Sequence, residues 1–207
     1  NAECQAAFGR TPAELLDQAG ALGPRATLVH ATHLTPADVE LLGGSRAAVC
    51  LCPVTEADLA DGVGPAPALA AAGSPLSLGS DGNRVIDLFE EARWLELAQR
   101  LVTGRRGHFT SEALARAATV AGHACLGWPD AGVLVPGAYA DLVTLSLDSP
   151  RLAGGGSDPL AAVFAAGTAA DVRHVVASGA DVVSGGRHLL LEDVPGELAA
   201  AISAVLG

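Results

Sequence analysis

The chain has 207 residues, of which 50% are hydrophobic, and a formal net charge of -11. This charge disfavours nucleic acid or an anionic membrane surface as a partner, because both would repel an acidic protein. No apolar run approaches the roughly 20 residues that a membrane helix requires, and the first residues lack the basic start and apolar middle of a secretory signal, so we expect a soluble, cytoplasmic protein.

Short apolar runs alternate with longer helical patterns over the first 128 residues. Two Thr-Pro pairs, at residues 11–12 and 35–36, are typical helix starts. The predicted helices cover residues 11–22, 35–44, 65–73, 87–101 and 110–128. The predicted strands cover residues 26–34, 47–53 and 75–81, and an acidic loop is expected at 54–64. This alternation favours an α/β fold whose parallel sheet has helical crossovers.

The pattern changes after residue 128 to short strands broken by glycines. Strands are predicted over 140–147, 172–179 and 180–190, with hairpin turns within 177–181 and 184–187. A loop is expected at 151–163 and a short helix at 195–206. The chain is therefore divided into an α/β part, residues 1–128, and a small β domain with a terminal helix, residues 129–207.

The four cysteines are Cys4, Cys50, Cys52 and Cys125. They are too few and too scattered for a disulfide framework, and no CxxC pair completes a tetrahedral thiolate site. Cys50 and Cys52 would share one face of a strand. We expect all four to be buried free thiols.

Polar side chains follow the carboxyl ends of the three strands predicted in residues 1–128. They are His30 and His33 on the first strand, Pro53 to Glu56 after the second, and Ser80 and Asp81 on the third. Loops that leave the carboxyl ends of parallel strands carry the chemistry of such folds. We therefore expect these side chains to meet on one rim.

Asp81 is the strongest candidate for chemistry. A carboxylate that ends an apolar strand must have its burial offset by a metal, a cation or several hydrogen-bond donors. The alternative is that Asp81 caps a helix beginning near Val85 or stabilises a turn at Gly82 and Asn83. Asp87 is the better cap candidate, which leaves Asp81 free for another role.

His30 ends the first predicted strand and Asp81 ends the third, and His30 belongs to the same rim as Asp81. If it follows the alternation of its strand, its ring points inward. His33 falls in the following turn, and for it we favour a structural role in which the ring bonds a loop carbonyl. The remaining histidines are assigned no role; they are His108, His123, His174 and His188.

Two clusters of charged residues have a simpler, structural interpretation. Glu56, Asp58 and Asp61 are expected to be solvated or to cap a helix, with Thr55 and Asp58 spaced as a capping-box variant. Substrate contact at Glu56 is the functional alternative, because loops at an active rim also bind substrates. A charged face of the long helix is expected to be exposed to water; its residues are Glu90, Glu91, Arg93 and Glu96.

Four segments together resemble the carboxyl-terminal part of a metal-dependent amidohydrolase: "VHATHLT", "LCPVTEADLADGVGP", "LSLGSDGNRVIDLFEEARWLELAQRL" and "GAYADLVTLSLDSP". More narrowly, "VHATH" and "CPVTEADLADG" resemble the N-formimidoyl-L-glutamate deiminases. The resemblance implies the second half of a (β/α)8 TIM-type barrel, part of a small β-sandwich domain, and one zinc ion at the barrel mouth. It makes Asp81 a zinc ligand and proton shuttle, and His30 the group that orients water and steadies developing charge.

The function implied by this resemblance is the zinc-dependent hydrolysis of N-formimidoyl-L-glutamate, a small molecule, to N-formyl-L-glutamate and ammonia in histidine degradation. The other zinc ligands and the arginines that bind the substrate carboxylates would lie upstream, so this chain alone is expected to hold zinc poorly and to be inactive. Gly82 and Asn83 replace a Ser-His pair of many relatives. The full-length form would be a homodimer.

Two alternatives remain open. The protein could be another zinc aminohydrolase of the same superfamily, acting on a purine or a chlorinated heterocycle. It could also be a noncatalytic fragment that binds a partner through an open sheet edge.

Overall fold

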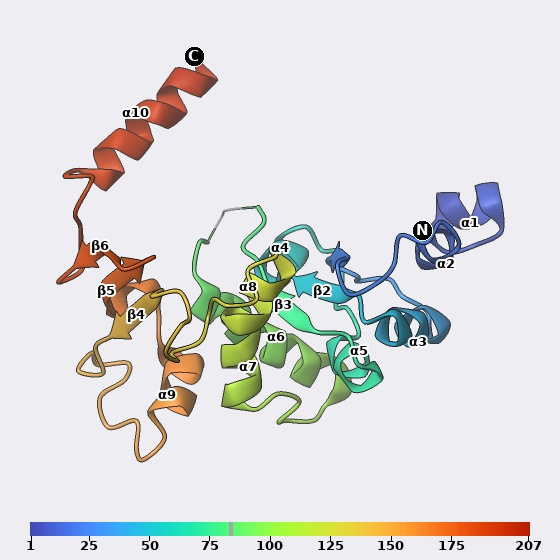
Figure 1. Ribbon diagram of the computed structural model, residues 1–207, viewed down its shortest axis with the longest axis horizontal. Coiled ribbons are helices and arrows are strands. Elements are labelled where there is room, and N and C mark those ends of the chain that lie inside the picture. Colours follow the sequence, from blue (N-terminus) through green and yellow to red (C-terminus); the bar gives the residue numbers. More distant parts are fainter. Residues whose placement is uncertain (83–84) are drawn as a thin grey trace.

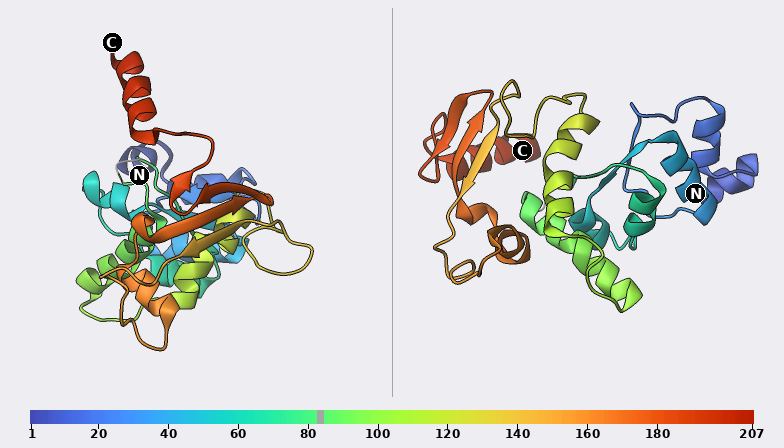
Figure 2. Two further views of the ribbon diagram at one scale, coloured as in Figure 1. Left: turned by 90° about the vertical axis from the view of Figure 1, so that its left-hand side faces the viewer. Right: turned by 60° about the horizontal axis from the view of Figure 1, so that its bottom comes forward.

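The computed structural model describes residues 1–82 and 85–207. Within them lie a three-stranded parallel sheet and a four-stranded antiparallel sheet. In the right-hand view of Figure 2 the antiparallel sheet lies apart from the parallel one, with helices between them. The mixed α/β character expected from the sequence is confirmed.

The parallel sheet has the order β1-β2-β3, with β1 at Thr27–Val29, β2 at Ala48–Leu51 and β3 at Leu76–Leu78. All three strands were predicted, but each is shorter than its apolar run. Val49 and Leu51 of β2 are buried against the helices. The opposite face carries Val29, which is 51% exposed, and the half-buried Cys50. The helices of the core therefore pack against the face of the sheet that carries Val49 and Leu51.

The helical layer that forms the core comes from several segments of the chain (Figure 1). It contains α3 (Pro36–Ser45), α5 (Ala66–Ala72), α6 (Leu88–Thr103) and α7 (Ser111–Ala118). Leu42, Leu69 and Leu95 from this layer pack with the buried side of β2. Removal of these apolar side chains from water stabilises the layer by about 2 kcal/mol each.

Both predicted Thr-Pro helix starts are confirmed. Thr11 caps α2 (Pro12–Gln18) and Thr35 caps α3, each in a reciprocal capping box with Pro at the first helical position. The two starts are joined, because the Thr11 hydroxyl donates to the carboxylate of Asp38. Residues before Thr11 form a further helix, α1 (Ala2–Phe8), that was not predicted.

Three expected loop or helix assignments are wrong. The acidic segment after β2 begins with a short helix, α4 (Pro53–Asp58), because Pro53 fits a first helical position and two carboxylates accept backbone N–H groups there. The predicted helix at 110–128 breaks at Thr119 (φ -128°, ψ -98°) into α7 and α8 (Val120–Cys125). The expected loop at 151–163 contains the start of α9 (Pro159–Ala166), which Asp158 caps.

The antiparallel sheet has the order β4-β5-β6-β7. Its strands are β4 (Leu142–Leu145), β5 (Val172–Ala177), β6 (Ala180–Ser184) and β7 (Arg187–His188), and the short helix η1 (Ala169–Asp171) precedes β5. The two predicted hairpin turns are confirmed, at Ser178–Gly179 and Gly185–Gly186. All four turn residues have φ between 51° and 81°, as a type I′ turn requires. The predicted terminal helix is α10 (Val194–Leu206), which projects away from the sheet with every residue exposed (Figure 1).

Helix α6 connects the two sheet regions. Asp87 caps it, as predicted, and also accepts from the backbone N–H of Ala169. Arg93 donates to the carbonyl oxygens of Ala165 and Gly167 just before η1. The rings of Phe89 and Phe164 pack at a tilt with their centroids 6.3 Å apart. Side-chain contacts from one helix therefore hold α9 and the residues that lead into β5.

The expectation of a water-exposed charged face on α6 is wrong. Glu91 is 0% exposed and Glu96 is 5% exposed. Glu96 accepts from Arg100, from Gly107 N (2.8 Å) and from Phe109 N (2.9 Å), so it fixes the turn into α7. Backbone N–H groups bind each of these buried carboxylates and offset its burial. Hydrophobic periodicity alone does not reveal such partners, so the burial could not be predicted from it.

The cysteines correct one smaller expectation. All four cysteines are free, but only Cys52 is buried, because Cys4, Cys50 and Cys125 lie on partly covered surfaces. Cys50 and Cys52 do share a face: a Cβ atom on Gly79 would lie 3.2 Å from both sulfur atoms. No helix in the described residues is long and apolar enough to cross a membrane.

Replacing Glu96 tests the buried carboxylate that fixes the turn into α7. We expect Glu96→Ala to lower the free energy of unfolding by about 2 to 4 kcal/mol, because two backbone N–H groups lose their acceptor. Urea unfolding measures this loss. Glu90→Ala on the same helix is the control, and equal losses in the two variants would contradict the assignment.

Glu91 predicts a pH dependence of stability. Burial raises its pKa from 4.5 to about 7, although Val54 N–H opposes the shift. The favourable contribution is therefore complete below pH 4.5 and is lost as the pH rises through about 7. We expect Glu91→Gln to reduce the fall in unfolding free energy between pH 5 and 8 by about 1 to 2 kcal/mol, because the amide does not ionise. An unchanged pH profile in urea titrations would refute this assignment, and Glu90→Gln serves as the control.

Candidate functional site

His30 lies directly after β1, in a turn rather than on the strand. His30 and Ala31 both have a left-handed backbone, with φ of 69° and 50°, which is uncommon for residues other than glycine. The backbone N–H of His30 still donates to the carbonyl of Cys50, at 2.8 Å. The condition for the expected orientation, that His30 follows the alternation of its strand, is not met, because the strand ends at Val29 and the turn sets the direction of the ring.

Asp81 follows β3 in a second turn at the same end of the sheet. Its Oδ2 lies 4.0 Å from Nε2 of His30, so the expected meeting of these two residues is confirmed. Its side chain is 43% exposed and its φ is 37°, so the expected burial is wrong: the chain leaves the sheet after Leu78. Asp81 does not cap α6, which begins at Leu88 with Asp87 as its cap. The proposed turn at Gly82 and Asn83 reaches Asn83, which lies outside the described residues.

Thr55 of α4 holds the turn that carries Asp81. Its hydroxyl donates to the carbonyl of Ser80 (3.3 Å) and accepts from the backbone N–H of Gly82 (3.0 Å). Thr55 is buried, and a Cβ on Gly82 would lie 3.3 Å from its hydroxyl oxygen. The residues on both sides of Asp81 are therefore bound to α4. The expected capping box of Thr55 with Asp58 is wrong, because α4 begins at Pro53.

Glu56, also on α4, contacts His30 from the other side of the ring. Its Oε1 accepts from Cys52 N at 2.9 Å and lies 3.4 Å from Nδ1 of His30. Glu56 is only 5% exposed, so the expectation that it is solvated is wrong, whereas Asp58 and Asp61 are exposed as expected. Burial raises the pKa of Glu56, and the Cys52 N–H and His30 oppose the shift.

The other histidines lie elsewhere. His33 is exposed, and its ring makes no hydrogen bond with the described residues, so the expected bond to a loop carbonyl is wrong; its own carbonyl accepts from Asn1 instead. His108 and His123 have their side-chain partners at Thr103 and Asp141.

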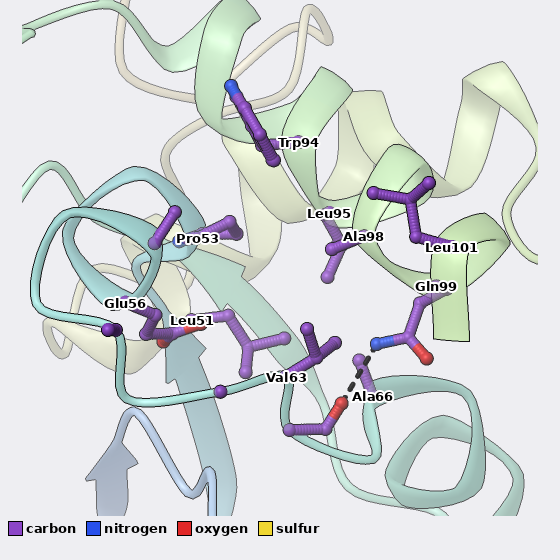
Figure 3. A pocket seen from close by; sticks show the side chains of 14 residues that line it. Leu51, Pro53, Glu56, Val63, Ala66, Trp94, Leu95, Ala98, Gln99 and Leu101 are labelled. Carbon is purple, nitrogen blue, oxygen red and sulfur yellow. Dashed lines mark hydrogen bonds between the residues drawn. The ribbon is translucent and has the colours of Figure 1, made fainter.

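The supporting roles of Thr55, Glu91 and Gln99 were not predicted from the sequence. Glu91 of α6 accepts from Val54 N (3.0 Å) at the start of α4. Gln99 donates to the carbonyl of Gly64 at 2.8 Å, the hydrogen bond drawn in Figure 3. A Cβ on Gly64 would lie 3.2 Å from the carbonyl oxygen of Ala31, so this segment passes tightly against the His30 turn. Pro53 at a helix start was the signal that could have revealed α4.

A cavity of about 250 Å³ lies behind the site, between α4, the segment before α5, and α6. In Figure 3, Trp94 and Leu95 line the α6 side of this cavity, and Pro53 and Val63 line its other sides. Its lining is mainly apolar, and it includes Glu56 but neither His30 nor Asp81. The cavity is therefore separate from the pair that could carry chemistry.

A complete metal site is not present among the described residues. No group of three or more His, Cys, Asp or Glu side chains within residues 1–82 and 85–207 could hold a metal ion. A catalytic zinc site uses three protein ligands and an open position. Asp81, partly exposed at the sheet end, can supply one oxygen donor, so this chain fits part of such a site and not the whole.

Comparisons with known proteins show which family this chain resembles. The sequence model described as "Amidohydrolase family" matches residues 1–182. Formimidoylglutamate deiminase of Pseudomonas aeruginosa is 40% identical over 195 residues, which cover 90% of this chain and 43% of that protein. A 5-methylthioadenosine/S-adenosylhomocysteine deaminase of Pelotomaculum thermopropionicum is 33% identical over 194 residues, 92% of this chain and 45% of that protein.

A solved structure is also similar to this chain in its three-dimensional fold. An adenosine deaminase from Xanthomonas campestris with bound zinc superposes with a TM-score of 0.91 at 29% identity, over 98% of this chain and 46% of that chain. The chain thus spans less than half the length of each of these three relatives. Because the family match covers residues 1–182 of the 207, this chain belongs to the amidohydrolase family.

Proposed function

We propose that the complete protein is a zinc-dependent hydrolase that acts on carbon-nitrogen bonds and converts N-formimidoyl-L-glutamate to N-formyl-L-glutamate and ammonia. The observation that carries this proposal is the meeting of His30 and Asp81, 4.0 Å apart, at the carboxyl end of a parallel sheet. The 40% identity to a formimidoylglutamate deiminase supports the choice of substrate.

We also propose the place of this chain in the complete fold. Residues 1–128 would form the last part of a (β/α)8 barrel, and residues 129–207 would form part of the small β domain. The parallel order of β1, β2 and β3, each followed by helices, supports this division. The exposed side chain of Val29 on the edge strand β1, which is 51% exposed, would be covered by the rest of the barrel. A homodimeric complete protein stays a prediction.

The proposed roles of the site residues follow from their positions. When bound, zinc would lower the pKa of a water from about 15.7 to about 7. The carboxylate of Asp81 would accept a proton from the attacking water and return it to the leaving nitrogen, which departs as ammonia. The imidazole of His30, beside Asp81, would form a hydrogen bond with the reacting water. It would also stabilise the charge that develops in the tetrahedral intermediate. The remaining zinc ligands would come from outside this chain.

A purine-type substrate is the second candidate. It is favoured by the 33% identity to a 5-methylthioadenosine/S-adenosylhomocysteine deaminase and by the TM-score of 0.91 with an adenosine deaminase. Both substrates present an amidine-like carbon that water attacks with loss of ammonia. The same His30 and Asp81 pair would serve either reaction.

Ammonia release by the complete protein tests the substrate and Asp81 together. We expect release from N-formimidoyl-L-glutamate, little from adenosine derivatives, and a loss of about 10²- to 10⁴-fold in kcat for Asp81→Asn, because the amide cannot accept the proton. A preference for the purines would replace the first candidate by the second. Full activity of Asp81→Asn would refute its assigned role.

The hydroxyl of Thr55 gives a test of how Asp81 is placed. We expect Thr55→Val to lower kcat by about 10- to 100-fold, because the loss of both hydrogen bonds lets the Ser80–Gly82 turn shift. Thr55→Ser keeps the hydroxyl and is expected to stay close to the unmodified enzyme. Equal kcat values for the valine and serine variants would show that this anchor has no effect on the reaction.

A further inference from the structure

Glu56 is buried in a place that suits contact with His30 better than contact with a substrate. Its side chain is 7% exposed, whereas that of His30 is 33% exposed. One oxygen, Oε1, meets both the Cys52 N–H and Nδ1 of His30. A substrate bound at the exposed side of His30 would therefore be separated from Glu56 by the ring.

We propose that Glu56 is a positioning residue that orients the His30 ring by accepting a hydrogen bond from its Nδ1. This inference rests on the proposed function, in which His30 takes part in the reaction. The carboxylate holds Nδ1 on the buried side, so Nε2 faces Asp81, from which it is 4.0 Å away. A second group that binds the rear nitrogen of a histidine fixes both its tautomer and its ring direction.

The need for such a support follows from the local backbone. His30 sits in a left-handed turn and not in a strand, so neighbouring strand side chains do not fix its ring. Glu56 is itself fixed, because the Cys52 N–H binds the same oxygen and burial surrounds the side chain. The contact with Glu56 therefore holds the His30 ring, which its own strand does not fix, against the start of α4.

The competing explanation is that Glu56 only caps α4. The chain offers a matched control for this explanation. Glu91 is also buried and also accepts one backbone N–H at the start of α4, that of Val54, but its carboxylate has no contact with His30 among the described residues. Loss of a cap is common to both residues, whereas loss of the His30 contact is specific to Glu56.

Steady-state kinetics of the complete protein compare Glu56→Ala, Glu56→Gln and Glu91→Ala. We expect Glu56→Ala to lower kcat by about 10- to 100-fold with little change in KM, because ring placement and not substrate binding is lost. Glu56→Gln keeps an acceptor oxygen and should recover most of the activity. Glu91→Ala should lose far less kcat than Glu56→Ala. A KM increase as the main effect of Glu56→Ala, or equal losses in the two alanine variants, would overturn the proposal.

A double-variant cycle tests whether Glu56 acts through His30. We expect Glu56→Ala to have little further effect in a His30→Asn background, because the ring that it orients is absent. An unchanged additional loss in that background would show that Glu56 acts by another route and would overturn the proposal.

Nitrogen-15 NMR of the histidine-labelled complete protein gives a readout that needs no substrate. At a pH where the ring is neutral, we expect His30, identified by its absence in His30→Asn, to carry its proton on Nδ1. Glu56→Ala should shift the proton toward Nε2, and Glu91→Ala should not. An Nε2-protonated ring in the unmodified protein would overturn the proposal. If formimidoylglutamate proves not to be the substrate, this measurement still decides the role of Glu56, so the two failures are distinguishable.

Discussion

The site depends on one short helix, α4, which begins where β2 ends. Its Thr55 binds the turn that carries Asp81, and its Glu56 reaches the ring of His30. The parallel sheet brings the two turns to one end, but the strands stop at Val29 and Leu78, before either residue. Hydrogen bonds from α4 therefore act together with the backbone bonds from His30 and Gly79 to β2 to set the distance between the two side chains.

Helix α4 is held in turn by buried carboxylates. Glu56 and Glu91 accept the backbone N–H groups of Cys52 and Val54, which a helix start otherwise leaves without partners. Burial raises the pKa of both acids, so this arrangement has an energetic cost. Such a cost is typical of sites in which placement of a side chain matters more than maximal stability.

Periodicity and breaker residues predicted much of the fold. The three parallel strands, the Thr-Pro helix starts and the two glycine hairpins depend on local patterns, and each was confirmed. The resemblance to amidohydrolases was also confirmed, and the meeting of His30 with Asp81 followed from the rule that parallel strands end on one rim. The roles of these residues and the division into two domains stay predictions.

The remaining features depend on contacts between distant segments. Acidic residues in a loop or on a helix are normally predicted to be exposed to solvent. Only the folded chain shows that Glu56, Glu91 and Glu96 bind backbone N–H groups. The left-handed backbone at His30 and the exposure of Asp81 likewise arise where the chain turns away from the sheet. No local pattern in "LVHATH" or "LGSD" encodes these turns.

A crystal structure of the complete protein with zinc bound tests the central claim most directly. The account predicts that a carboxylate oxygen of Asp81 lies within about 2.0 to 2.2 Å of the metal. It also predicts that His30 lies beside the metal, with Nδ1 against Glu56 and with Thr55 bound to the Asp81 turn. Zinc bound without contact to Asp81, or a His30 ring turned away from the metal, would contradict the account.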